Sequence, residues 1–217
     1  SIIIGILFMV FHDLNRFVPA FITKALIMPV IIAFFFLNMK NDKKPMHIFM
    51  FAGLFFSWTG DVLLEFSGNW PSMFIAGLAG FLLAHIMYLI VFFRSPGRNA
   101  VFNNRIYLLI PVIAYGLTFL YFLYDHLGDM KIPVLLYAVV MLAMLAGAVN
   151  RIEKVNRLSF LMVLMGAVLF VISDSLIAIG KFITPFAFST MAVMITYIIA
   201  QLLITIGYIR QFRERLI

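Results

Sequence analysis

The sequence has no cysteine and few charged residues, and both shortages narrow what the chain can be. Without cysteine it can form neither disulfides nor thiolate metal sites. Only 12% of the residues are charged, whereas 65% are hydrophobic and the mean hydropathy is +1.10. A soluble domain of 217 residues cannot bury that much apolar surface. The composition therefore indicates an all-α protein that crosses a membrane several times.

Apolar runs of about 20 residues are typical of helices that cross a bilayer. We predict eight such helices, at 2–11, 17–38, 46–66, 71–93, 105–124, 131–149, 158–181 and 186–209. The first run is shorter than a full span. Because no linker or low-complexity tract separates the runs, we expect residues 1–217 to form one integral-membrane domain.

The net charge of +7 comes from basic residues that gather at one set of helix ends. Twelve of the 16 basic residues lie in three loops and at the C-terminus, three in each: Lys40, Lys43, Lys44, Arg94, Arg98, Arg105, Arg151, Lys154, Arg157, Arg210, Arg213 and Arg215. The positive-inside rule then predicts a cell-membrane protein with both termini in the cytoplasm. Topology and anionic lipid headgroups explain these loops, so the charge does not indicate a nucleic-acid partner.

Two aspartates lie inside predicted spans: Asp61 in FFSWTGDVLLEF and Asp174 in GAVLFVISDSLIAIGKF. A charged side chain at the bilayer centre costs about 2.5–3.5 kcal/mol on insertion scales, so such groups are usually functional. The alternative is that each carboxyl only ties helices together through a buried hydrogen bond. In the predicted orientation both aspartates lie nearer the non-cytoplasmic side, and Lys24 lies at a similar depth.

A weak internal repeat relates the two halves of the chain. GDVLL around Asp61 aligns with SDSLI around Asp174 at an offset of 113, and at that offset Lys24 aligns with Tyr137. Helices related in this way run in the same direction. The alignment therefore predicts a parallel four-plus-four repeat about an axis along the membrane normal.

The repeat places different side chains at matching positions. The first half has Lys24, Asp61 and His85, and the second half has Tyr137, Asp174 and Gln201. His85 and Gln201 align once three inserted residues are allowed for. A cation beside Asp61 would keep it ionised, whereas Asp174, buried without a cation, would stay protonated. An acid and an anion of this kind suit acid–base chemistry. The ordinary alternatives are a snorkelling lysine, an interfacial tyrosine, and a histidine and glutamine that only bind neighbouring helices.

Two further residues flank Asp61 on its helix. Ser57, one turn before it, is expected to bond the carboxylate or its own backbone. Glu65, one turn after it, could share the face of Asp61, but its place near the helix end favours exposure to solvent or headgroups. Asp61, Asp174 and His85 have the residue types of a metal site, but their spacing is not diagnostic, and we expect neither a metal nor a cofactor.

Ser173 precedes the second aspartate and belongs to a small-residue series. Gly166, Ser173 and Gly180 recur every seven residues. This spacing predicts close helix packing along one face of the helix that carries Asp174.

Five motifs together resemble the YhhN family of membrane lysoplasmalogenases: TKALIMP, GDVLLEF, GLAGFLLAHIMY, GAVLFVISDSLIAIGKF and YIIAQLLITIGY. They cover the second to the eighth predicted spans. One departure is Ala25, where many relatives would have proline. The resemblance implies eight helices and a lysophospholipid substrate from the bilayer. Its vinyl ether bond would be hydrolysed to a fatty aldehyde and a glycerophospho-ethanolamine or -choline.

Vinyl ethers are cleaved by acid, which fits two carboxyl groups with different protonation states. We expect Asp174 to be the acid and Asp61 the anion and base, with the reverse assignment as the alternative. His85 or Tyr137 could orient water or bind the glycerol hydroxyl, and Lys24 could hold the phosphate.

Two other classes of function stay open. A proton-coupled transporter would also use membrane carboxylates, although the repeats here are parallel and no pair of broken helices is evident. A non-catalytic lipid-binding membrane protein would not need paired acids at one depth. The sequence does not predict the oligomeric state.

Overall fold

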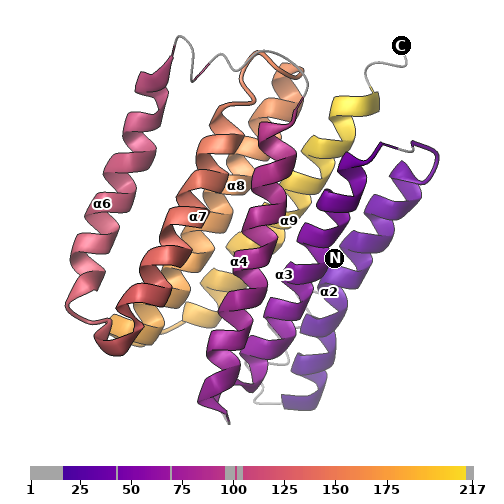
Figure 1. The fold of residues 1–217 in the computed structure, drawn as a ribbon. Helices are drawn as coiled ribbons and strands as arrows, with labels where there is room; N and C mark the ends of the chain where they lie inside the picture. The colour runs from indigo at the N-terminus through magenta and orange to yellow at the C-terminus, as the bar shows by residue number, and fades with distance from the viewer. Residues whose placement is uncertain (1–16, 43, 69, 96–100, 102–104, 214–217) are drawn as a thin grey trace. The chain divides into compact units, whose positions relative to one another are not determined.

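The computed structural model describes residues 17–42, 44–68, 70–95, 101 and 105–213 (Figure 1). Within these ranges the chain forms helices and turns and no strand, as the composition predicts. The predicted span at 2–11 lies outside the described residues. The chain divides into two compact units, the N-terminal unit Ser1–Tyr88 and the C-terminal unit Leu89–Ile217. The single membrane domain stays a prediction.

The N-terminal unit contains α2 (Phe17–Met39), α3 (Met46–Glu65) and most of α4 (Pro71–Phe93), with a 3₁₀ turn at Phe66–Gly68. α2 packs against α3, as their neighbouring indigo and violet ribbons in Figure 1 show. α3 and α4 approach closely because both carry glycine at the contact: a Cβ on Gly80 would lie 2.9 Å from the backbone nitrogen of Gly60. This contact fixes the backbone of α3 immediately before Asp61.

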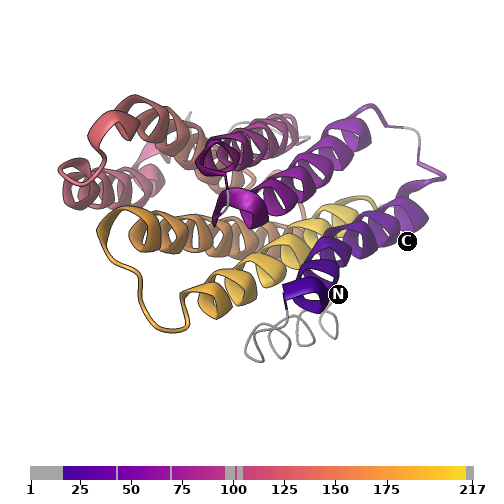
Figure 2. The ribbon, with the colours of Figure 1, turned by 90° about the horizontal axis from the view of Figure 1, so that it is seen from below.

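The C-terminal unit contains four long helices, a 3₁₀ turn before each of the first two and a π-helical turn after the third. They are α6 (Ile110–Tyr124), α7 (Lys131–Val149), α8 (Arg157–Ala178) and α9 (Ser189–Arg213), with the turns at Ile106–Leu109, Gly128–Met130 and Ile179–Ile183. α7 packs against both α6 and α8, and α8 packs along α9, to which the yellow-orange loop in Figure 2 connects it.

The packing of α8 on α9 tests the predicted small-residue series. A Cβ on Gly166 would lie only 2.8 Å from the carbonyl oxygen of Ala200, so the two backbones nearly touch there. Ser173 continues the contact by donating from its hydroxyl to the carbonyl oxygen of Val193, at 3.1 Å. A Cβ on Gly180 would meet nothing within 4 Å. The prediction of close packing is therefore confirmed at Gly166 and wrong at Gly180, because α8 widens into its π turn there.

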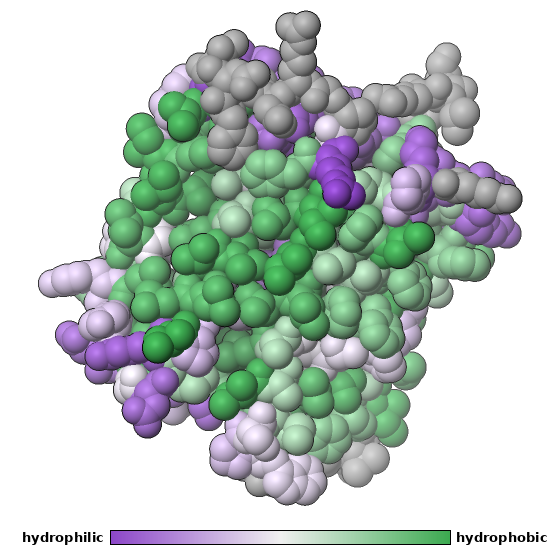
Figure 3. Space-filling view, viewed as in Figure 1, coloured by the Kyte–Doolittle hydropathy of each residue, from purple (hydrophilic) through white to green (hydrophobic). Residues whose placement is uncertain are grey.

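Seven of the described helices are long and apolar enough to cross a membrane. Each corresponds to one of the predicted spans from 17–38 onward. Large apolar side chains cover their outer faces, for example along α6, where Leu117 is 67% and Ile113 56% exposed. Figure 3 shows hydrophobic side chains over the middle of the helices and hydrophilic ones toward their ends. The chain is thus an integral membrane protein, whereas the eighth helix and the internal repeat stay predictions.

A basic residue that the sequence analysis assigned only to topology has a structural role. Arg151, just after α7, is fully buried; its two terminal guanidinium nitrogens donate to the hydroxyls of Ser95 at 2.8 Å and Ser159 at 2.9 Å. Burial lowers the pKa of Arg151 to about 10, and burial and the charge of Arg151 lower the pKa of Lys154. The guanidinium fork thereby joins the start of α8 to the residues that follow α4.

Candidate functional site

The contact between α7 and α8 brings a tyrosine to a buried carboxyl group. Asp174 on α8 is 8% exposed, and the hydroxyl of Tyr137 on α7 donates a hydrogen bond of 2.6 Å to its Oδ2. That distance is at the short end for O–H···O bonds, as expected where one partner is a carboxyl group. The repeat grouped these two residues from sequence, and the structure brings them together. Their roles in a reaction stay predictions.

A second tyrosine reaches the same turn of α8 from α6. The hydroxyls of Tyr115 and Ser175 lie 2.5 Å apart, and Ser175 also donates to the carbonyl oxygen of Val171 at 2.7 Å. A serine hydroxyl carries only one hydrogen, so Tyr115 is the donor to Ser175. The sequence analysis missed Tyr115, because one more tyrosine in an apolar span carries no distinguishing signal.

The end of α8 departs from regular helix shortly after Asp174. The five residues Ile179–Ile183 form a π-helical turn, closed by a bond from the backbone nitrogen of Thr184 to the carbonyl oxygen of Ile179, at 3.1 Å. Single π turns in membrane and soluble helices are often found at functional sites. Ser173, on the other side of the aspartate, anchors α8 to α9 through Val193. Asp174 thus sits between an anchored and a widened part of its helix.

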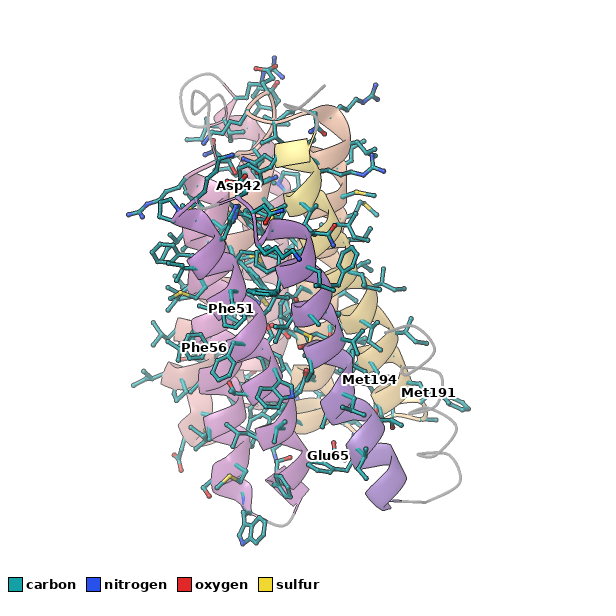
Figure 4. The ribbon with its side chains drawn as sticks, turned by 90° about the vertical axis from the view of Figure 1, so that its right-hand side faces the viewer. Asp42, Phe51, Phe56, Glu65, Met191 and Met194 are labelled. Atoms are coloured by element: carbon teal, nitrogen blue, oxygen red, sulfur yellow. The ribbon has the colours of Figure 1, made fainter. Side chains whose placement is uncertain are left out.

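The N-terminal unit holds the other aspartate beside an ion pair. Lys24 on α2 donates to Oε2 of Glu65 on α3 at 2.7 Å, with side-chain exposures of 14% and 18%. Asp61, 6% exposed, lines the same narrow crevice between α2 and α3 as this pair. The expectation that Glu65 faces solvent or headgroups is therefore wrong, because Lys24 neutralises it in a mostly buried position. Figure 4 shows Glu65 at the end of α3 opposite to Asp42.

The remaining predicted site residues are all buried. Ser57 on α3 and His85 on α4 are fully buried in the N-terminal unit, and Gln201 on α9 is fully buried in the C-terminal unit. Among the residues that the structure describes, no group of three or more His, Cys, Asp or Glu is placed to hold a metal ion.

Ala25, where the resemblance departs from its family pattern, has a local contact of its own. Its carbonyl oxygen accepts a hydrogen bond of 2.9 Å from the indole nitrogen of Trp58. Trp58 lies one turn before Asp61, so this bond joins α2 to α3 beside the crevice.

The sequence is similar to those of proteins named lysoplasmalogenase. Lysoplasmalogenase TMEM86B of Homo sapiens is 32% identical over 142 residues, which are 65% of this chain and 56% of that protein. Lysoplasmalogenase of Mycobacterium bovis is 32% identical over 157 residues, 71% of this chain and 58% of that protein. The chain therefore spans a little over half the length of these curated relatives, and no solved structure matches it. Residues 20–208 match the YhhN family model, and the chain belongs to the YhhN family.

Proposed function

We propose that this protein hydrolyses the vinyl ether bond of lysoplasmalogens within the membrane. The products would be a fatty aldehyde and a glycerophospho-ethanolamine or -choline. The observation that carries this proposal is the hydrogen bond of Tyr137 to Asp174, a buried carboxyl group in a membrane-spanning helix. The relatives named lysoplasmalogenase support the choice of reaction.

The reaction begins with the transfer of a proton to carbon. The π electrons of the double bond take the proton of a carboxylic acid at the carbon β to the ether oxygen, and the acid becomes a carboxylate. A lone pair of the ether oxygen stabilises the cation left on the other carbon, which is an oxocarbenium ion. Water adds to this cation at the carbon bonded to oxygen and gives up a proton to a base. The resulting hemiacetal collapses to the aldehyde and the free glycerol hydroxyl, so one water is consumed overall. Such a site needs a neutral acid and an anion, in the manner of glycoside hydrolysis.

We assign the acid to Asp174. Its partner Tyr137 is a neutral phenol that donates to Oδ2, so the transferable proton belongs on Oδ1. A carboxyl group buried in a membrane helix is most stable when neutral, which keeps this proton available. The reverse assignment exchanges the roles of the two aspartates and predicts the same products.

Asp61 is assigned to the anion that stabilises the oxocarbenium ion and accepts the proton from water. The cation of Lys24 lines the same crevice and favours the ionised carboxylate. In this proposal Lys24 serves both carboxylates of the crevice: it is bound to Glu65 and it also offsets the anion on Asp61. His85 orients water or binds the glycerol hydroxyl.

The orientation in the membrane belongs to the same proposal. With the basic loops on the cytoplasmic face, both termini lie in the cytoplasm and both aspartates lie nearer the opposite face of the cell membrane. A single-chain lipid can then enter sideways from the bilayer.

The proposal is tested with the purified protein in detergent micelles. A 1-alkenyl lysophosphatidylethanolamine is added, and free aldehyde is measured through its reduction by an alcohol dehydrogenase. We expect aldehyde release that Asp174→Asn abolishes. The matched 1-acyl and 1-alkyl lysolipids should stay intact, since neither contains a vinyl ether. Release of fatty acid from the 1-acyl lipid, or no aldehyde from the alkenyl lipid, would contradict the proposed function.

A further inference from the structure

The C-terminal unit has an apolar groove beside the Asp174 site. It lies between α6, α7 and α8 and has a volume of about 430 Å³. Its floor is formed by buried side chains, namely Val112, Leu145 and Val171, with exposures of 9%, 7% and 3%. Met165 and Ile172 stand at its rim, 54% and 39% exposed. The groove is therefore open along the outer face of these helices.

One end of the groove carries its only hydroxyl among the described lining residues. Tyr115 lines the groove and donates to Ser175, the residue that follows Asp174. All the other lining side chains are hydrocarbon, thioether or proline. A headgroup or a glycerol bound along this surface would be buried without a charged or amide partner, which is costly. A hydrocarbon chain has no polar group and carries no such cost.

The size of the groove suits one hydrocarbon chain. Lining residues of α8 extend from Leu164 to Ile172, a distance of roughly 12 Å along a helix. A groove of this length, with a volume of about 430 Å³, has room for an extended segment of a hydrocarbon chain.

We infer that this groove binds the alkenyl chain of the single-chain lipid substrate, with the vinyl ether at the Tyr115 end and the methyl end toward Leu164. This inference rests on the proposed function, because it positions the reacting bond beside Asp174. The groove sets the preference for chain length, because its side chains pack against the methylenes and its far end near Leu164 limits how far the chain extends within it.

The first test fills the groove. Val168 lines it, whereas Val139 on α7 is 62% exposed and does not line it, so Val168→Phe and Val139→Phe form a matched pair. kcat/KM is measured for octadecenyl and butenyl lysoplasmalogens, because a four-carbon chain that starts at the Tyr115 end does not reach Val168. Val168→Phe should lower the value for the long chain by about tenfold or more and change the short-chain value little, because a misfit of one group in an apolar pocket costs about 10–200-fold. Val139→Phe should keep the wild-type ratio.

The second test does not depend on turnover. An uncleavable 1-alkyl lysophosphatidylcholine with a diazirine at the chain end is photo-crosslinked to the wild-type protein, and labelled peptides are identified. We expect labelling of α6 and α8 around Leu108 and Leu164, competed by unlabelled 1-alkyl lipid and lost in Val168→Phe.

The two tests separate the two proposals. An unchanged chain-length ratio in Val168→Phe, or an equal change in Val139→Phe, would overturn the groove assignment even if aldehyde is released. Labelling that unlabelled lipid does not compete would show an ordinary bilayer contact and overturn it as well. Competed labelling in a protein that releases no aldehyde would support the groove and contradict only the proposed reaction. If Val168→Phe fails to fold, Val168→Ala serves instead and should favour bulkier, branched chains.

Discussion

Tyr137 and Asp174 are joined by a hydrogen bond of 2.6 Å between α7 and α8, with the phenol as donor and Oδ2 as acceptor. The bond holds the carboxyl group in one rotamer and distinguishes its two oxygens. In the proposed reaction it leaves Oδ1 to carry the proton that moves to the substrate. Tyr137 is therefore a positioning residue, acting through Asp174.

Tyr137→Phe should retain the fold and lower kcat by about tenfold or more, because Asp174 becomes an anion as it gives up its proton and a hydrogen bond to a charged group contributes about 1.5–3 kcal/mol. KM should change little, since the hydroxyl positions the acid and does not bind the lipid. Aldehyde release over a range of substrate concentrations measures both constants. Tyr121→Phe is the matched control, because Tyr121 on α6 is 79% exposed. Wild-type kcat in Tyr137→Phe would remove this bond from the mechanism.

Asp61→Asn and Asp174→Asn should each reduce turnover by about a hundredfold or more, in the range of acid–base catalysis. The amide keeps the size of the side chain but cannot hold or accept the proton. Both variants should elute from size exclusion as the wild-type protein does, because neither substitution adds a buried charge. Turnover near the wild-type rate in either variant would exclude that aspartate from the reaction.

Lys24→Met should lower the thermal stability of the protein, because Glu65 would lose its cation while remaining mostly buried. The double variant Lys24→Met with Glu65→Gln should recover most of that stability, since neither charge is then left alone. We expect turnover to stay low in the double variant, because the cation beside Asp61 is still missing. Thermal unfolding and aldehyde release are measured on the same samples. Full recovery of turnover would mean that Lys24 acts only by neutralising Glu65.

Most of the fold could be predicted from the sequence, because spanning helices are set by length and hydropathy alone. The seven described spans begin and end within four residues of the predicted runs. The pairing of Tyr137 with Asp174 could also be predicted, because the alignment of the two halves places Tyr137 at the position of Lys24 and Asp174 at the position of Asp61.

The remaining features depend on which side chains meet across helices, and a single sequence does not contain that information. Glu65 looks like an exposed residue at a helix end until α2 brings Lys24 to it. Arg151 looks like one more cytoplasmic positive charge until Ser95 and Ser159 enclose it. Tyr115 has no local signal at all.

The predicted orientation can be tested by cysteine labelling, because the chain has no native cysteine. Gly68→Cys and Glu153→Cys introduce thiols at exposed positions, and a Cβ at Gly68 would meet nothing within 4 Å. In intact cells an impermeant maleimide should label Gly68→Cys, and Glu153→Cys should react only after permeabilisation. Labelling of Glu153→Cys from outside, with Gly68→Cys protected, would reverse the orientation.

The close approach of α8 and α9 at Gly166 leads to the last prediction. Gly166→Ala should lower the midpoint of thermal unfolding in detergent by several degrees, because its Cβ would lie 2.8 Å from the carbonyl oxygen of Ala200 and the backbone must shift. Gly180→Ala, in the π turn that follows α8, is the matched control: its Cβ has no neighbour within 4 Å, so it should leave the midpoint unchanged or raise it slightly.

Because Asp174 lies on α8 between the two glycines, the same samples also report on the site. A shift of α8 at Gly166 should reduce aldehyde release at temperatures where the protein is still folded. Equal midpoints for the two variants would show that the α8–α9 contact yields easily and does not hold Asp174 in place.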